Sequence, residues 1–146
     1  MEQRLKIQDV QPAAWKAMYE LSNSLAGAKL TKTQMSLITI RASQINRCAF
    51  CIDMHTKEAL KAGENDQRLF LLDAWKETDK FSKEEKVLLS MTEEITLVSH
   101  HGLSEETYKK AKELFSDEMI AQAIMAIVII NGWNRIAVST QMPIGQ

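Results

Sequence analysis

The segment 117-DEMIAQAIMAIVIINGWNRIAVST-140 contains the longest apolar run of the chain and decides its fold class. Ser116 precedes it as a helix N-cap, acidic residues fill its first turn, where the helix dipole favours them, and Pro143 follows its end. The apolar run itself covers residues 119–130 and is shorter than the roughly 20 residues that a membrane span requires. We therefore predict a long helix that is buried inside the protein or against another subunit.

Helix-capping signals divide the rest of the chain in the same way, and together they predict about seven helices. These helices are expected to begin near residue 12, 31 or 33, 47 or 48, 65, 82, 104 and 116. The sequence 82-SKEE-85 is a capping box, and Gly63 is a natural helix end. No window shows the sustained period-two alternation of a strand, although residues 128–130 alone could pass for a buried one. We expect a single all-α domain over residues 1–146.

The composition is that of an ordinary globular domain. Of the 146 residues, 45% are hydrophobic and 25% are charged, a mixture that can fill a core and excludes wholesale disorder. Eighteen Lys and Arg against nineteen Asp and Glu leave a net charge of -1 without a basic block, which argues against nucleic acid as the main partner. The N-terminal sequence has no apolar signal core, so we expect a cytoplasmic protein that is not anchored in a membrane.

Two cysteines and a histidine form the one cluster of the sequence that carries chemistry, in the segment 48-CAFCIDMH-55. If this segment is helical from its first residue, Cys48, Cys51 and His55 share one face over two turns. A CxxC pair at a helix start commonly has a lowered thiol pKa, because free N–H groups and the helix dipole stabilise the thiolate. His55 could take the thiol proton or, as a cation, hold the thiolate. Because cytosolic thiols are kept reduced, the arrangement favours redox chemistry in which one sulfur attacks an oxidised atom and the other resolves the product.

Two other interpretations of the cysteine pair remain open. Free cysteines are among the most buried residue types, so the pair could be inert core. A zinc ion could bind two thiolates and one imidazole, but it needs a fourth ligand. The other two histidines, His100 and His101, lie far away in the sequence. We therefore expect neither a metal nor another cofactor.

The residues around the cysteine pair resemble a known family. Residues 41–63, RASQINRCAFCIDMHTKEALKAG, look like the core of the alkylhydroperoxidase-D-like (AhpD-like) branch of the carboxymuconolactone decarboxylase family. The likeness continues through residues 72–78, 91–96 and 131–143, so that it covers most of residues 30–143 in the family's order. The string SQIN-x-CxxCxxxH is the specific part of this resemblance.

The resemblance implies an all-α fold that assembles as trimers or hexamers, with a peroxidase or disulfide-reductase activity. On the family's pattern, Cys51 would attack a hydroperoxide, Cys48 would resolve the sulfenic acid, and His55 would relay the proton. A dithiol or thioredoxin-like reductant would then restore both thiols. The position at a helix start would by itself favour Cys48 as the attacking thiol, so the two roles could be exchanged. The apolar last helix independently favours a homo-oligomer, in which a second copy buries its outer faces.

The chain departs from the family at the proton relay. Well-studied members carry a glutamate twelve residues before the first cysteine, where this chain has Ser36, whose hydroxyl cannot take up the charge. Glu58, three residues after His55, is a candidate replacement for that carboxylate. Asn134 and Arg135 belong to the resembled pattern and are candidates to line the site from the last helix, although Arg135 could equally pair with a carboxylate across a subunit interface.

These departures keep two rival functions open. Ser36, together with Phe50 where some members have a histidine, favours a slow peroxidase or a thiol–disulfide exchange protein over a fast enzyme. A redox-sensing or interaction module would be oxidised reversibly without turnover. A ring-opening decarboxylase, as in the other branch of the family, would not need the cysteine pair at all.

Overall fold

The computed structural model describes residues 2–145, and within that range the chain forms helices and no strand. The all-α prediction is therefore confirmed. The elements are α1 (Ile7–Val10), α2 (Pro12–Asn23), α3 (Lys32–Ile45), α4 (Ala49–Lys61), α5 (Asp66–Leu71), the 3-10 helix η1 (Leu72–Glu77), α6 (Lys83–Thr96), α7 (Glu105–Leu114) and α8 (Asp117–Thr140).

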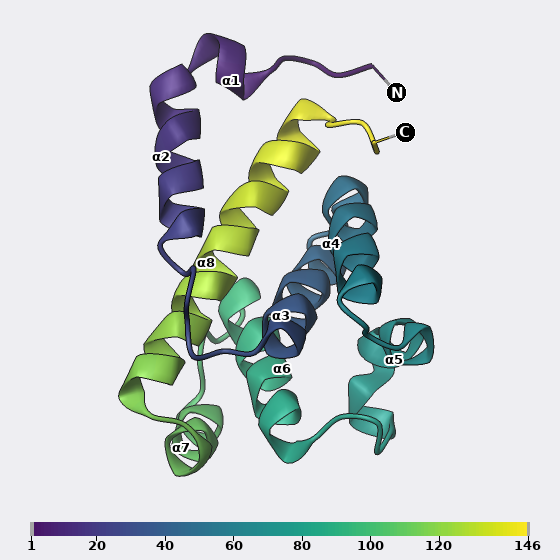
Figure 1. Cartoon of the computed structure of the whole chain (residues 1–146). Helices are drawn as coiled ribbons and strands as arrows, with labels where there is room; N and C mark the ends of the chain where they lie inside the picture. Colours follow the sequence, from purple (N-terminus) through teal and green to yellow (C-terminus); the bar gives the residue numbers. More distant parts are fainter. Residues whose placement is uncertain (1, 146) are drawn as a thin grey trace.

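The long helix α8 runs through the middle of the molecule, with α2 along one side and α3 and α6 on the other (Figure 1). Among the described residues, it is the one helix whose length and apolar composition would suffice to cross a membrane. It is packed instead by α2, α3, α4, α6 and α7. The two chain ends meet at its C-terminus, where the Arg4 N–H donates to the Thr140 carbonyl at 2.9 Å. Part of this helix therefore packs inside the protein, while burial of the rest against another subunit stays a prediction.

Helix α3 is buried between two apolar clusters, and this position fixes the start of α4. Ile38 faces the cluster that α3 shares with α6, α7 and α8, whereas Leu37 and Ile40 face the cluster that includes α5 and η1. Side chains at adjacent helical positions point about 100° apart, so one helix can supply both clusters. With both faces of α3 held, the turn after it has a fixed direction.

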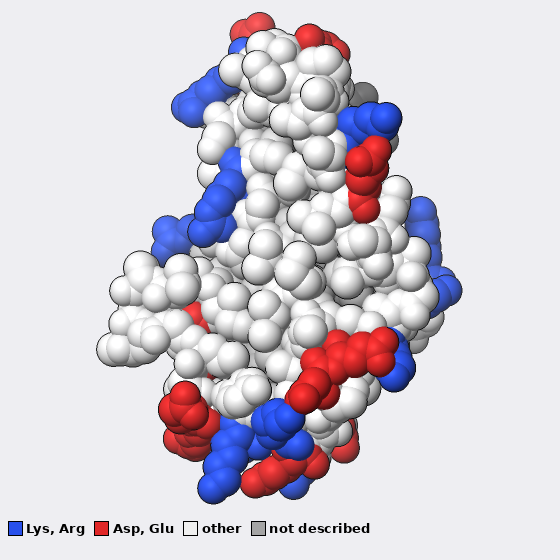
Figure 2. All heavy atoms as spheres, turned by 90° about the vertical axis from the view of Figure 1, so that its left-hand side faces the viewer, with Lys and Arg blue, Asp and Glu red and all other residues white. Residues whose placement is uncertain are grey.

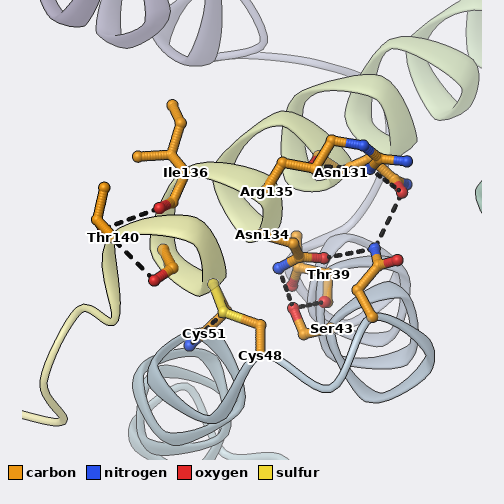
Figure 3. Close-up of a disulfide and its surroundings, with 11 residues drawn as sticks. Thr39, Ser43, Cys48, Cys51, Asn131, Asn134, Arg135, Ile136 and Thr140 are labelled. Atoms are coloured by element: carbon orange, nitrogen blue, oxygen red, sulfur yellow. Dashed lines mark hydrogen bonds between the residues drawn. A yellow bond between two sulfur atoms is a disulfide. The ribbon is translucent and has the colours of Figure 1, made fainter. Parts of the chain in front are cut away.

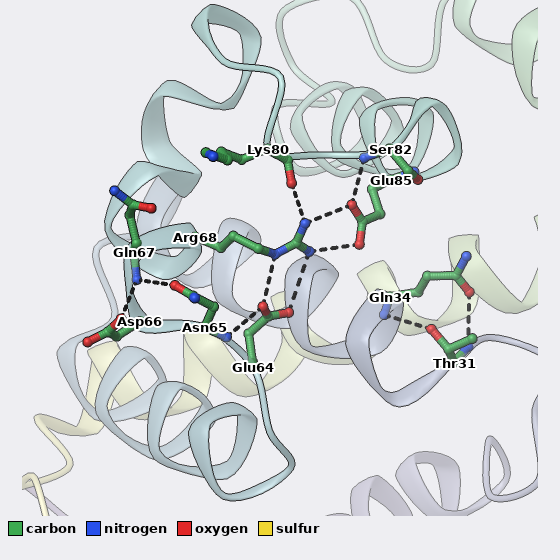
Figure 4. Close-up of polar contacts among 10 residues, drawn as sticks. All are labelled: Thr31, Gln34, Glu64, Asn65, Asp66, Gln67, Arg68, Lys80, Ser82 and Glu85. Carbon is green, nitrogen blue, oxygen red and sulfur yellow. Dashed lines mark hydrogen bonds and ion pairs between the residues drawn. The ribbon is translucent and has the colours of Figure 1, made fainter.

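Capping boxes start two of the helices. The Thr31 hydroxyl accepts the Gln34 N–H at 3.1 Å, and the Gln34 side chain accepts the Thr31 N–H at 2.9 Å (Figure 4). The Ser82 and Glu85 pair makes the same exchange at the start of α6. Each capping box satisfies two of the N–H groups that a helix start leaves free. The predicted starts of both helices are confirmed.

The structure adds one short helix that the sequence did not predict, α1, and divides the helix expected from residue 65 into α5 and η1. The four residues of α1 are followed at once by α2, and α1 buries no residue. After α5 the chain tightens into η1, whose Ala74 leaves the helical region of backbone angles. Trp75, after this kink, is buried, whereas the side chain of Phe70 on α5 is exposed.

Helix α2 packs along one side of α8 and has no buried residue. Trp15 and Tyr19 of α2 pack edge-on against Trp133 of α8, each with ring centroids 5.1 Å from it. The side of the molecule that carries α2 has a central area without charged side chains (Figure 2). Met125 and Val128 of α8 remain exposed, so a single chain does not bury every face of this helix. A second copy on this side stays a prediction.

Candidate active site

A tight reversal of the chain after α3 delivers the first cysteine to the start of α4. The Cys48 N–H donates to the Ser43 carbonyl at 3.0 Å and the Arg47 N–H to the Gln44 carbonyl at 3.1 Å. These two bonds form a Schellman motif, in which the residue after the helix cap takes a left-handed conformation. Here that residue is Arg47, with φ of 53°. The chain accepts this strain at a non-glycine residue, and Cys48 becomes the N-cap of α4.

The two sulfurs are joined as a disulfide and lie inside the protein. Cys48 is 1% exposed and Cys51 2%, and both pack against Ala137 of α8. The Cys51 N–H donates to the Cys48 sulfur at 3.3 Å. The helical position expected for Cys48 is therefore wrong: it lies one residue before α4, with extended backbone angles, and its sulfur turns back onto the first turn. In the reduced protein, this N–H and the helix dipole would stabilise a thiolate at Cys48.

His55 lies one turn after Cys51 on α4 and is held by a carboxylate. Its Nδ1 atom is 3.0 Å from the Glu58 Oε2 atom, and the role of Glu58 in a proton relay stays a prediction. Burial lowers the pKa of the His55 imidazole below its ordinary value of 6.5, and the hydrogen bond and charge of Glu58 oppose that shift. The imidazole is therefore mainly neutral at pH 7 and free to accept a proton.

The pKa of His55 can be measured directly by NMR titration of its ring protons. We expect a midpoint below 6.5, because desolvation penalises the imidazolium. Glu58→Gln should lower the midpoint further, because it removes the negative charge and the carboxylate hydrogen bond that favour the imidazolium. The resonance is assigned by its loss in His55→Gln. A midpoint at or above 6.5 would contradict the buried position.

A chain of side-chain hydrogen bonds ties α8 to the turn that carries Cys48 (Figure 3). Asn134 is fully buried; it donates to the Ser43 hydroxyl at 2.9 Å and accepts from the Asn46 amide at 3.0 Å. The Asn46 amide also donates to Asn131, which bonds Thr96 of α6 in turn. Since the Ser43 carbonyl receives the Cys48 N–H, Asn134 holds the residue that positions the first cysteine.

Asn134→Ala is expected to lower the free energy of unfolding by about 2 kcal/mol, because it removes the hydrogen bonds of the Asn134 amide to the buried Ser43 hydroxyl and to the partly buried Asn46 side chain. The neighbouring substitution Arg135→Ala is the control and should stay within about 0.5 kcal/mol, as Arg135 is exposed. Urea unfolding followed by circular dichroism measures both. Equal effects of the two substitutions would show that the buried hydrogen bonds of Asn134 contribute no more to the free energy of unfolding than an exposed side chain does.

A pocket of about 560 Å³ opens beside the disulfide, between the start of α4 and the chain after α8. Its lining is mostly apolar and includes Phe50, Val138 and Met142. Cys48 contributes to the lining, whereas Cys51 does not. The sequence did not predict this pocket, because its two walls come from segments about 90 residues apart and no spacing rule connects them.

Ser36, Asn134 and Arg135 are not among the residues that line this pocket. Arg135 is exposed and donates to the carbonyl and side chain of Asn131 on its own helix, so it is not part of the pocket lining. Ser36 lies half-buried on α3, and its carbonyl accepts the Thr39 hydroxyl at 3.1 Å. Within residues 2–145, no group of three or more His, Cys, Asp or Glu side chains is arranged to hold a metal ion.

Comparisons with known proteins agree with this arrangement. The carboxymuconolactone decarboxylase family model matches residues 12–94. The uncharacterised protein YdfG of Bacillus subtilis is 39% identical over 139 residues, which cover 95% of each chain. A structure from Agrobacterium tumefaciens, described as a protein of unknown function and candidate antioxidant defence protein AhpD, matches with a TM-score of 0.95, 34% identity and 99% of both chains.

A structure with lower sequence identity shares the fold. The debrominase Bmp8 matches with a TM-score of 0.83 and 16% identity, over 94% of this chain and 74% of its own, and at that identity it shows the fold alone. The family model covers more than half of the chain, and the Agrobacterium structure agrees over its whole length. This chain is therefore a member of the carboxymuconolactone decarboxylase family and belongs to its AhpD-like branch.

Proposed function

We propose that this protein is a cysteine-dependent peroxidase that reduces hydroperoxides through a cycle between a dithiol and a disulfide. The single observation that carries the proposal is the joined pair Cys48–Cys51 at the start of α4, with His55 one turn further on. Membership of the AhpD-like branch supports the same chemistry.

The cycle needs only these three side chains, a hydroperoxide and a dithiol. The Cys51 thiolate attacks the terminal oxygen of the O–O bond and becomes a sulfenic acid, while the alkoxide leaves and takes a proton. Neutral His55 accepts the Cys51 thiol proton and delivers it to that alkoxide. The Cys48 thiolate then attacks the Cys51 sulfur, forms the disulfide and expels water after protonation. A dithiol or thioredoxin-like reductant returns two electrons and two protons.

The proposal is tested with the reduced wild-type protein and tert-butyl hydroperoxide. We expect two free thiols to disappear for each hydroperoxide consumed in a first turnover, and continued consumption once dithiothreitol is supplied. Loss of hydroperoxide without loss of thiols would refute the dithiol cycle.

We also propose that the protein is a cytoplasmic homo-oligomer, a trimer or hexamer, joined through the side that carries α2. A monomer in light scattering would refute the proposed oligomer.

One observation favours a second candidate, a redox sensor without turnover. Ser36 stands where well-studied relatives have the glutamate of the proton relay, and exposed Glu58 is a weaker substitute for a buried carboxylate. A sensor would lose its two thiols once, stoichiometrically, and would regain them too slowly to sustain consumption. The same assay with dithiothreitol therefore separates the two candidates.

A further inference from the structure

Resting on the proposed function, we infer that the reducing thiol reaches the disulfide through the pocket beside α8 and attacks Cys48, with an apolar part of the reductant seated in that pocket. This reaction is the half of the cycle that restores the dithiol.

Access to the two sulfurs is unequal. Both are almost completely buried, so a thiol can approach only where the surface is hollowed. The 560 Å³ pocket is lined by Cys48 but not by Cys51. A second hollow of about 460 Å³ lies on the other side of Arg47 and Ala49, towards Asp73, and neither cysteine lines it. Of these two hollows, the first therefore leads to a sulfur, and that sulfur belongs to Cys48.

The exchange then proceeds in two balanced steps. The incoming thiolate forms a bond to the Cys48 sulfur, the Cys48–Cys51 bond breaks, and Cys51 leaves with the electron pair. The second thiol of the reductant attacks the sulfur of the first, and Cys48 leaves as a thiolate that the Cys51 N–H can stabilise. One dithiol is oxidised and one disulfide is reduced. This order frees Cys51, the sulfur proposed to attack hydroperoxide, in the first step and one turn from His55.

The lining of the pocket indicates the chemical class of the reductant. Phe50, Val138, Met142 and Ile144 present apolar surface, which favours the uncharged body of an apolar thiol over a strongly solvated one. Arg47 adds one exposed cation to the lining. The pocket wall from the end of α8 is kept near Cys48 by the buried Asn134 contacts.

The chain offers a matched pair of substitutions to test the route. Val138 lines the pocket and is 49% exposed, whereas Val98, just after α6, is 66% exposed and does not line it. The oxidised protein is reduced with 1-butanethiol, and thiol release is followed in time. Val138→Trp should slow reduction about tenfold or more by filling the pocket, while Val98→Trp should stay within about twofold of wild type. Equal rates for all three proteins would overturn the proposed route.

A second measurement locates the attacked sulfur in the unmodified protein. The oxidised wild type is mixed with 1-butanethiol, quenched in acid within milliseconds to seconds, alkylated and mapped by tandem mass spectrometry. Extrapolated to zero time, the butylthio adduct should lie on Cys48 rather than Cys51 by about ten to one, because thiol exchange depends on access to the sulfur. An adduct mainly on Cys51 would overturn the assignment. No hydroperoxide is used, so an inactive peroxidase with the adduct on Cys48 would refute the proposed function alone.

Discussion

Cys51→Ser is expected to abolish hydroperoxide consumption, lowering kcat/KM by about a thousandfold or more, as the loss of a nucleophile does in other covalent enzymes. A serine hydroxyl is almost never ionised near neutral pH, and its oxygen does not donate an electron pair to the O–O bond, as the sulfur does when it is oxidised. The measurement is the loss of tert-butyl hydroperoxide in the presence of dithiothreitol. Circular dichroism must show an unchanged helix content.

Cys48→Ser is the matched control, since it makes the same chemical change three residues away. With Cys51 intact, this variant should consume about one equivalent of hydroperoxide and then stop with a sulfenic acid on Cys51, which a dimedone probe captures. The reverse outcome, with the sulfenic acid on Cys48 in the Cys51→Ser variant, would exchange the two roles. Unchanged turnover in Cys51→Ser would remove this cysteine from the chemistry altogether.

Most of the fold could be predicted from the sequence because the signals that start its helices are local. Thr31, Ser82 and Ser116 each accept a backbone N–H from the turn that follows, and that interaction depends on three or four neighbouring residues only. The short helix α1 escaped because its four residues are too few to show a helical period, and the break between α5 and η1 lies inside a segment whose apolar spacing indicated one helix.

The site was only partly predictable because its supports come from distant segments. The spacing of Cys48, Cys51 and His55 indicated the chemistry, and Glu58 could be found because it lies less than one turn beyond the histidine. The contact of Asn134 with Ser43 joins residues 91 positions apart, which no periodicity reveals. The left-handed Arg47 is equally hidden, since glycine or asparagine is the usual residue at such a helix end.

Arg68 illustrates the same limit at a second place in the fold, where it connects α5 to the start of α6 (Figure 4). Its guanidinium donates to Glu64 at 2.9 Å, to Glu85 at 2.7 and 3.2 Å, and to the Lys80 carbonyl. It also lies 4.8 Å from the centre of the Phe81 ring. The hydrogen bond with Glu85 is the main reason that the pKa of Arg68 is raised above its ordinary value. One cation thus holds two carboxylates, and Glu85 is also part of the capping box of α6.

Arg68→Met is expected to lower the free energy of unfolding by about 3 kcal/mol or more, although methionine keeps the apolar stem of the side chain. The Glu64 and Glu85 side chains are only 7% and 13% exposed, so the substitution leaves two partly desolvated carboxylates beside each other without a cation. Urea unfolding measures the loss. Replacing both carboxylates as well, in Glu64→Gln/Arg68→Met/Glu85→Gln, should restore part of it, because the uncompensated charge is then removed.

Lys110→Met is the matched control for this prediction. Lys110 forms a well-placed ion pair with Glu106 at 2.6 Å, but both side chains are more than half exposed, and water replaces such a partner readily. We therefore expect the stability of this variant to equal that of the wild type within experimental error. If Arg68→Met lost no more unfolding free energy than Lys110→Met, the explanation would be wrong. Desolvation of Glu64 and Glu85 would then not account for the contribution of Arg68 to the packing of α5 and α6.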